Sequence, residues 1–139
     1  GVVTWGPIGG GFLSGKYKPG ERTKSGTRSE EGWAYPGKFF APNADETLSV
    51  LLEVAEELRR SPAQVAIRWL LERPHVTSVI TGARTIDHFE NNVGAADWSL
   101  PTEAYDRLTE VSAPRIKYPE AMEWSRDEAR LSAITGPSV

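Results

Sequence analysis

Two segments of the chain combine glycines with cations and hydroxyls in an order suited to binding phosphate groups. The first, GGFLSGKY, runs from Gly10 to Tyr17 and matches the start of the P-loop pattern GxxxxGK[ST]. The second, TGARTIDHFENN, runs from Thr81 to Asn92. Glycine lets a backbone approach a phosphate closely, and arginine forms paired hydrogen bonds to it. Both segments are therefore candidates for an anion-binding site.

The first segment departs from a P-loop in both chemistry and context. A P-loop lysine is followed by a Ser or Thr that ligates Mg²⁺, and the loop leads into a long helix. Here Lys16 is followed by Tyr17, and Lys18-Pro19-Gly20 would break a helix in its first turn. A nucleotide hydrolase is therefore disfavoured, and a glycine-rich turn without a ligand stays open as the alternative.

The elements expected around these segments place each of them after a strand. Short β-prone runs predict strands over residues 1–5 and 76–82, and a long loop is expected over 17–42. Helices are expected over 43–60, 61–72, 86–94 and 102–111, with a weak helical signal over 122–134. Strands that alternate with helices predict an α/β fold with parallel strands, in which anionic ligands bind where strands end and helices begin.

Capping residues and apolar spacing define these helices. Asn43 is expected to cap the first helix, and Ser61 and Gln64 fit a capping box with Pro62 at the first helical position. The buried positions are expected to be Leu48, Leu51, Leu52, Ala55, Leu58, Val65, Ala66, Trp69, Leu70, Leu108 and Val111.

Composition limits the classes of protein that the sequence fits. The 139 residues are 39% hydrophobic and 25% charged, which is typical of one globular domain. The 16 Lys and Arg are scattered among 19 Asp and Glu, so nucleic acid is not an expected partner. No apolar run reaches the roughly 18 residues that span a bilayer, and we expect a cytoplasmic protein with no membrane partner. The lack of Cys excludes disulfides, thiolate metal sites and a cysteine nucleophile.

Taken together, three segments closely resemble motifs of the aldo-keto reductase family. WGPIGGGFLSGK, from Trp5 to Lys16, is similar to the seventh-strand motif WSPLxxGx[LV][ST]GK. VITGART, from Val79 to Thr85, resembles the start of the eighth-strand segment GARTxxQxx[DE]NxxA, and SPAQVAIRW at residues 61–69 also matches the family. The resemblance extends over residues 1–112, in order and with matching intervals.

The resemblance implies a (β/α)₈ TIM barrel that transfers a hydride between NADP(H) and a carbonyl or alcohol. Residues 1–118 would form its C-terminal part, the seventh and eighth βα units, and residues 119–139 a C-terminal tail. A barrel of this type needs eight strands and about 250 residues. The chain is therefore expected to be incomplete alone and to need a missing N-terminal barrel half or self-association.

The same resemblance implies a site for the nicotinamide dinucleotide. The pyrophosphate and the nicotinamide ribose would be lined by Trp5, Gly6, Pro7, Ile8, Gly9, Gly10 and Lys16, with Arg28 clasping the phosphates. The adenosine 2′-phosphate would be held by Gly82, Ala83, Arg84 and Thr85, and the adenine side met by His88, Asn91 and Asn92. Three positions depart from the family pattern: Gly6 replaces Ser, His88 replaces Gln, and Asn91 replaces an acidic residue.

No catalytic residue and no metal site is expected in this chain. In the resembling family the proton-donating Tyr and its Lys, Asp and His partners come from the first half of the barrel. We expect Tyr17, Tyr35, Tyr105 and Tyr118 to be packing or surface residues and His75 to be solvated. Two alternatives stay open: a non-catalytic nucleotide-sensing or subunit-interaction module of the same fold, and a split enzyme completed by another chain.

Overall fold

A computed structural model describes residues 1–21, 25 and 42–113 of the chain. Most of the expected 17–42 loop and the whole 119–139 tail lie outside these residues. So do Arg28, Tyr35 and Tyr118. Among the helices in the described part of the chain, none combines the length and apolar character needed to cross a bilayer.

Both expected strands are present, and they pair in parallel as expected. Strand β1 spans Val2–Trp5 and strand β2 spans Val76–Ile80, with Val3 opposite Ser78 and Trp5 opposite Ile80. β2 ends two residues before the expected boundary. β1 stops at Trp5, which pairs with Ile80. Residues after Ile80 therefore have no partner strand in the described two-stranded sheet.

The segment after β1 forms a 3-10 helix, η1, over Gly9–Ser14, which the sequence did not indicate as a separate element. It ends at Gly15, whose φ of 84° lies in the left-handed region. Phe12 and Tyr17 are buried beside it, with ring centroids 5.8 Å apart, and pack in a small core with Leu48. η1 is therefore fixed to the body of the molecule by aromatic packing.

The four expected helices are all present. They are α2 (Ala44–Glu57), α3 (Pro62–Leu71), α4 (Ile86–Val93) and α5 (Thr102–Val111). α2 ends before the expected residue 60, where Arg59 takes a φ of 51° that a helix does not accommodate. The capping box of α3 is confirmed, since Ser61 Oγ accepts from the Gln64 N–H at 3.1 Å and Gln64 Oε1 accepts from the Ser61 N–H at 3.2 Å.

The expected capping role of Asn43 is wrong. Asn43 occupies the N-cap position of α2, but its side chain makes no capping hydrogen bond. Its Nδ2 instead donates to the carbonyl oxygens of Val111 at 2.8 Å and Ala113 at 3.0 Å. Asn43 thus connects the start of α2 to the end of α5, where the last helical carbonyls lack partners within their own helix.

Salt bridges join the same two helices at the surface. Arg107 of α5 bonds Glu57 at 2.9 Å and Glu53 at 3.2 Å, both on α2. The hydrogen bond to Glu57 raises the pKa of the Arg107 guanidinium above its ordinary value. Arg107 therefore bridges the two helices as a cation.

The main core lies between α2, α3 and α5, and it differs in part from the expected set. Val54, which was not expected, is fully buried, and so is Val65. Trp69 is only partly buried, and its Nε1 donates to Thr109 Oγ1 at 3.0 Å, whereas Ile67 of the same helix is buried. Other expected positions that are only partly buried are Leu52, Leu58, Leu70 and Val111.

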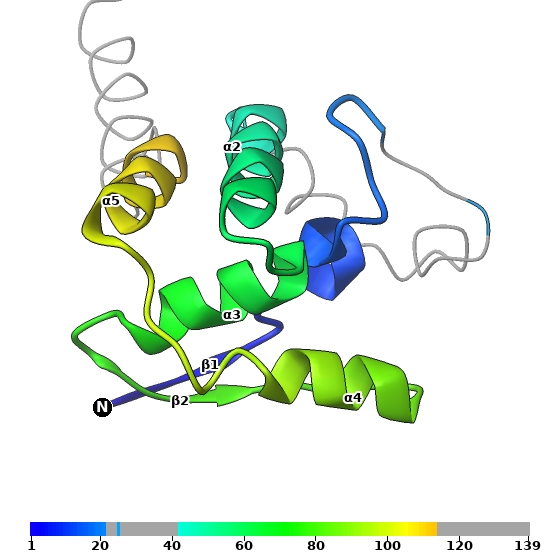
Figure 1. Ribbon diagram of the computed structural model, residues 1–139, viewed down its shortest axis with the longest axis vertical. Helices are drawn as coiled ribbons and strands as arrows, with labels where there is room; N and C mark the ends of the chain where they lie inside the picture. The colour runs from blue at the N-terminus through cyan, green and yellow to red at the C-terminus, as the bar shows by residue number, and fades with distance from the viewer. Residues whose placement is uncertain (22–24, 26–41, 114–139) are drawn as a thin grey trace, which may run out of the picture.

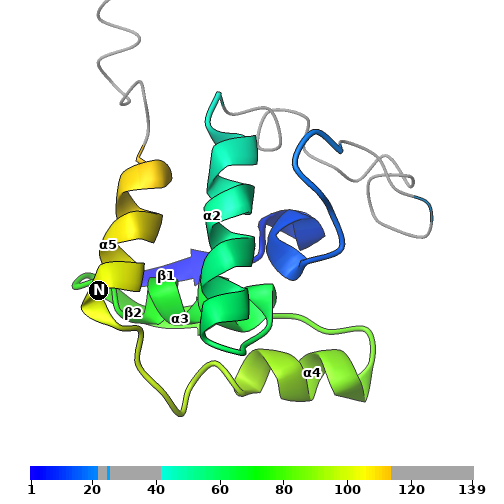
Figure 2. The ribbon, with the colours of Figure 1, turned by 45° about the horizontal axis from the view of Figure 1, so that its top comes forward.

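The elements are arranged in layers (Figure 1). The sheet and α4 form one side, α3 lies across the sheet, and α2 and α5 stand side by side on the far side of α3. Figure 2 shows the same order after rotation. Helices thus cover one face of the sheet, and the strand residues Val3 and Trp5 are exposed on the other.

Gly15 gives a test of this packing, because η1 meets the start of α3 there. A Cβ at Gly15 would lie 2.9 Å from Pro62 Cγ, in addition to the cost of its φ of 84°. We expect Gly15→Ala to lower the free energy of unfolding by about 2 kcal/mol, measured by urea denaturation. The control is Gly20→Ala, where φ is 87° but nothing lies within 4 Å. Equal losses in the two variants would contradict the contact with Pro62.

Candidate functional site

A cavity of about 540 Å³ lies where the two phosphate-suited segments meet, beyond the ends of β1 and β2. Thirteen of the fifteen residues that the resemblance assigns to the cofactor line it. The two exceptions are Thr85, which does not line the cavity, and Arg28, which lies outside the described residues. The fold therefore brings together two segments that are far apart in the sequence.

The first wall of the cavity is the glycine-rich segment that follows β1. Gly10 and Gly11 have φ values of 66° and 106°, which residues with a Cβ rarely adopt. The Gly9 N–H donates to Gly6 O at 2.9 Å, and the Gly11 N–H donates to Ile8 O at 3.0 Å. These short-range bonds fold the segment tightly, so that backbone rather than side chains faces much of the cavity.

The second wall is the turn between β2 and α4, together with the first turns of α4. Gly82, Ala83 and Arg84 line the cavity and are exposed. Thr85 is the N-cap of α4, and its Oγ1 accepts from the His88 N–H at 3.3 Å. The structure thus gives Thr85 a capping role and directs the amino end of α4 toward the site.

Asn92 is placed differently from its neighbour Asn91. Asn91 is partly buried, whereas Asn92 is only 6% exposed, and its Nδ2 donates to Thr81 Oγ1 at 3.0 Å. Thr81 is the first residue after β2. Asn92 therefore lines the cavity and is also hydrogen-bonded to Thr81 at the end of β2.

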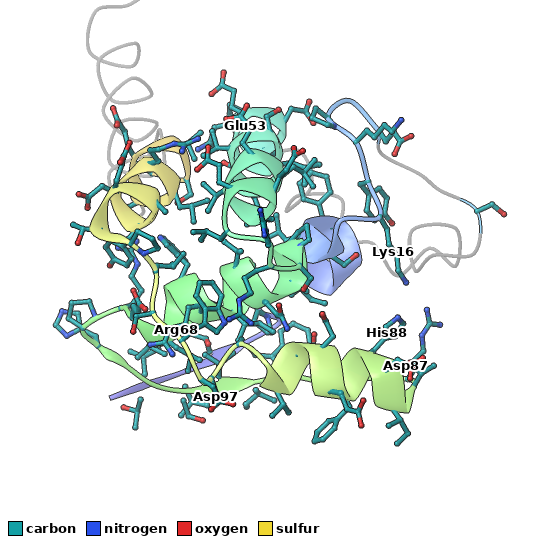
Figure 3. All side chains as sticks on the ribbon, viewed as in Figure 1. Lys16, Glu53, Arg68, Asp87, His88 and Asp97 are labelled. Atoms are coloured by element: carbon teal, nitrogen blue, oxygen red, sulfur yellow. The ribbon has the colours of Figure 1, made fainter. Side chains whose placement is uncertain are left out.

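The charge of the lining favours an anionic ligand. Among the described residues that line the cavity, two are cations, Lys16 and Arg84, and none is an Asp or Glu. Figure 3 shows the Lys16 side chain extending toward the amino end of α4, where His88 lies. A helix N-terminus adds amide donors and a favourable dipole for negative charge. Within the described ranges no group of His, Asp or Glu residues could hold a metal ion.

The structure adds six residues to the expected lining. They are Gly11, Ser14, Tyr17, Ala63, Ile80 and Thr81. Gly11 and Ser14 lie inside the first segment and could have been included on position alone. Ser14 Oγ donates to Gly11 O at 2.6 Å, so this hydroxyl supports the tight backbone. Ala63 comes from the start of α3, and no local sequence signal indicates that it would reach the cavity.

The described tyrosines and His75 are placed as expected. Tyr17 is 4% exposed and packs against Phe12. Tyr105 is partly buried, and its hydroxyl accepts from Arg73 at 3.3 Å, on the side of the molecule formed by α3 and α5. His75 is exposed in the turn before β2.

Comparison with protein families gives a match that covers most of the chain. The model of the aldo/keto reductase family matches residues 1–113. This range includes both walls of the cavity and all seven elements described above.

Individual relatives show the same similarity. A probable voltage-gated potassium channel subunit beta from Arabidopsis thaliana is 31% identical over 87% of this chain and 38% of its own length. The oxidoreductase YrpG of Bacillus subtilis is 30% identical over 89% of this chain and 36% of its own length. The aldo-keto reductase str7 of Strobilurus tenacellus is 34% identical over 96% of this chain and 38% of its own length.

The chain thus spans little more than a third of the length of each of these three relatives. The family match nevertheless includes every residue that the structure describes. The chain belongs to the aldo/keto reductase family.

Proposed function

We propose that this chain is the NADP(H)-binding part of an aldo-keto reductase and forms the seventh and eighth βα units of its barrel. The observation that carries the proposal is the cavity in which the glycine-rich segment after β1 meets the Gly82–Arg84 turn after β2. Parallel βα units bind ligands at the carboxyl ends of their strands, and this cavity lies there.

The donor set of the cavity fits a phosphorylated dinucleotide. Lys16 and the tight backbone of η1 suit the pyrophosphate, and Arg84 suits the 2′-phosphate, because a guanidinium binds a phosphate through two parallel hydrogen bonds. Trp5 is 68% exposed at the rim, where an aromatic face can contact a flat ring. When bound, the nicotinamide group would supply the hydride.

The groups that deliver a proton are proposed to come from outside this chain. Tyr105 lies with Arg73 between α3 and α5 and does not line the cavity, and Tyr17, which does line it, is 4% exposed and packs against Phe12. The role proposed for this chain is therefore to bind and orient the dinucleotide.

The uncovered face of the molecule supports association with further strands. In the described part of the chain, seven large apolar side chains are exposed, and these lie on the sheet and α4: Val2, Val3, Trp5, Ile80, Ile86, Phe89 and Val93. Parallel sheets are normally buried on both faces, and open strand edges promote pairing. We propose that the remaining barrel strands and helices cover this face, either within a longer polypeptide or from a second chain.

A non-catalytic role is the second candidate. It is favoured by the similarity to channel beta subunits, at 31% identity for the Arabidopsis protein and 33% for one from Oryza sativa. In that case the same cavity would bind the dinucleotide as a sensor. Oxidation of NADPH that depends on an added carbonyl compound, measured in the protein that carries this chain, would favour the reductase over the sensor.

Arg84 gives the direct test of the cofactor assignment. We expect Arg84→Ala to weaken NADPH binding about ten- to a hundredfold and to change NADH binding little, because only NADPH carries the 2′-phosphate. Binding is measured from the fluorescence of the reduced nicotinamide.

The matched control is Lys18→Ala, which removes one positive charge from an exposed position that does not line the cavity. We expect this variant to bind NADPH like the wild type. No binding of NADPH by the wild type at millimolar concentration, or equal weakening by both substitutions, would refute the assignment.

The exposed apolar face gives an independent test. We expect the isolated chain to self-associate through this face, and Ile86→Ser with Phe89→Ser to shift it to the monomer in sedimentation experiments. These side chains are 71% and 54% exposed, so the double variant costs little core packing. The control is Glu90→Ser on the same helix, which should leave the association unchanged. A monomeric wild type would contradict the proposed interface.

A further inference from the structure

Arg73 differs from the other partly buried arginines of the described ranges, which are Arg68 and Arg107. Arg68 bonds Glu72 at 2.8 Å, and Arg107 bonds two glutamates of α2. Within the described part of the chain, Arg73 contacts no carboxylate. Charges that are withdrawn from water are normally paired. Arg73 is therefore suited to a counter-charge that comes from outside the described residues.

Aromatic rings hold the Arg73 guanidinium in place. Its Cζ lies 4.2 Å from the centroid of the Trp69 ring and 5.9 Å from that of the Tyr105 ring. The Trp69 ring is itself fixed, because its Nε1 donates to Thr109 Oγ1 at 3.0 Å, and that hydroxyl donates to Tyr105 O at 2.7 Å. The guanidinium thus lies on rings that are joined by hydrogen bonds, which limits the entropy that Arg73 loses when it binds a ligand.

Arg73 and Tyr105 have hydrogen-bond donors to offer an anion. An arginine has five N–H donors, and the described residues accept from Arg73 at one place, where Nη1 donates to the Tyr105 hydroxyl at 3.3 Å. That hydroxyl keeps its own hydrogen, which no described residue accepts. Glu72 is engaged elsewhere, because its Oε1 accepts from Arg68 Nε and the Leu100 N–H, each at 2.8 Å.

The cluster of Trp69, Arg73 and Tyr105 lies at the opposite end of the sheet from the cavity. The Val76 N–H donates to Arg73 O at 3.0 Å, so Arg73 is at the beginning of β2, whereas the cavity lies beyond the ends of the strands. Figure 1 shows α5 beside this end of α3, on the side of the sheet that the helices cover. The exposed apolar face of the sheet is on the other side. The cluster is therefore a separate surface.

We propose that Trp69, Arg73 and Tyr105 form a docking site for a glutamate or aspartate side chain of a separate protein. One guanidinium balances one negative charge and binds a carboxylate through two parallel hydrogen bonds, to which the Tyr105 hydroxyl adds a third. Trp, Tyr and Arg are also the residue types enriched at the energetic centres of protein interfaces. A carboxylate on a polypeptide fits better than a free phosphate, because the two rings add apolar contact area beside a single cation.

A short acidic peptide tests the site directly. The probe carries two glutamates around a leucine and a neutral dye, and its control has glutamines in place of the glutamates. We expect the protein to bind the acidic peptide in the millimolar range or tighter, and the control about ten times more weakly, because a neutral amide loses the charge-assisted hydrogen bonds. Binding is measured by fluorescence anisotropy.

Substitutions in the cluster locate the binding. Arg73→Gln should weaken binding of the acidic peptide about tenfold or more, and Tyr105→Phe, which keeps the ring and removes the hydroxyl, about three- to tenfold. The matched control is Arg60→Gln. Arg60 also lies over an indole ring, that of Trp98 at 5.1 Å, but it is exposed, and no described tyrosine hydroxyl accepts from it. This variant should bind the peptide like the wild type.

The same variants separate this site from the proposed cofactor site. Arg73→Gln should bind NADPH like the wild type, because the cluster lies away from the cavity. A wild type that binds the peptide and no NADPH would refute the cofactor assignment and support the docking site. If Arg73→Gln does not fold, Arg73→Lys takes its place, since it keeps the charge, loses the planar donors and should weaken peptide binding about threefold or more.

Three results would overturn the proposal. They are equal binding of the acidic and the neutral peptide, no binding of either at millimolar concentration, and equal weakening by Arg73→Gln and Arg60→Gln.

Discussion

The parallel pairing of β1 with β2 is the constraint on which the site depends. Trp5 lies opposite Ile80, so both strands end at the same edge of the sheet. The glycine-rich segment and the Arg84 turn leave that edge side by side, although α2 and α3 separate them in the chain. Antiparallel pairing would place the two segments at opposite ends of the sheet. Parallel pairing brings Lys16 of the first segment close to Arg84 and the helix N-terminus of the second.

The helices maintain this pairing by covering one face of the sheet. α3 packs on β2, and α2 packs on both α3 and α5. The Trp69–Thr109 hydrogen bond joins α3 to α5, and Asn43 and Arg107 connect α2 to α5. η1 in turn contacts the start of α3 through Gly15 and Pro62. The cavity is thus built on packed elements, whereas the opposite face of the sheet exposes the apolar side chains of Val3 and Trp5.

Local signals in the sequence predict the helices and strands well. They predict poorly the polar contacts between residues that are far apart in the chain. The Ser61–Gln64 capping box and the β-branched run of β2 depend on neighbours in the chain, and both are confirmed. Asn43 has the local signature of a cap, yet its amide bonds carbonyls at the end of α5. Most of the cavity lining follows from two motifs. Ala63 does not, because it reaches the site only through the packing of α3.

We propose that this cavity binds a phosphorylated dinucleotide through the segments that follow β1 and β2. Calorimetric titration with adenosine 2′,5′-bisphosphate, compared with adenosine 5′-monophosphate, tests it most directly because the two ligands differ only in the 2′-phosphate. We expect measurable binding of the bisphosphate, with an affinity about tenfold or more higher than that of the monophosphate. Equal affinity for the two ligands, or binding of neither, would contradict it.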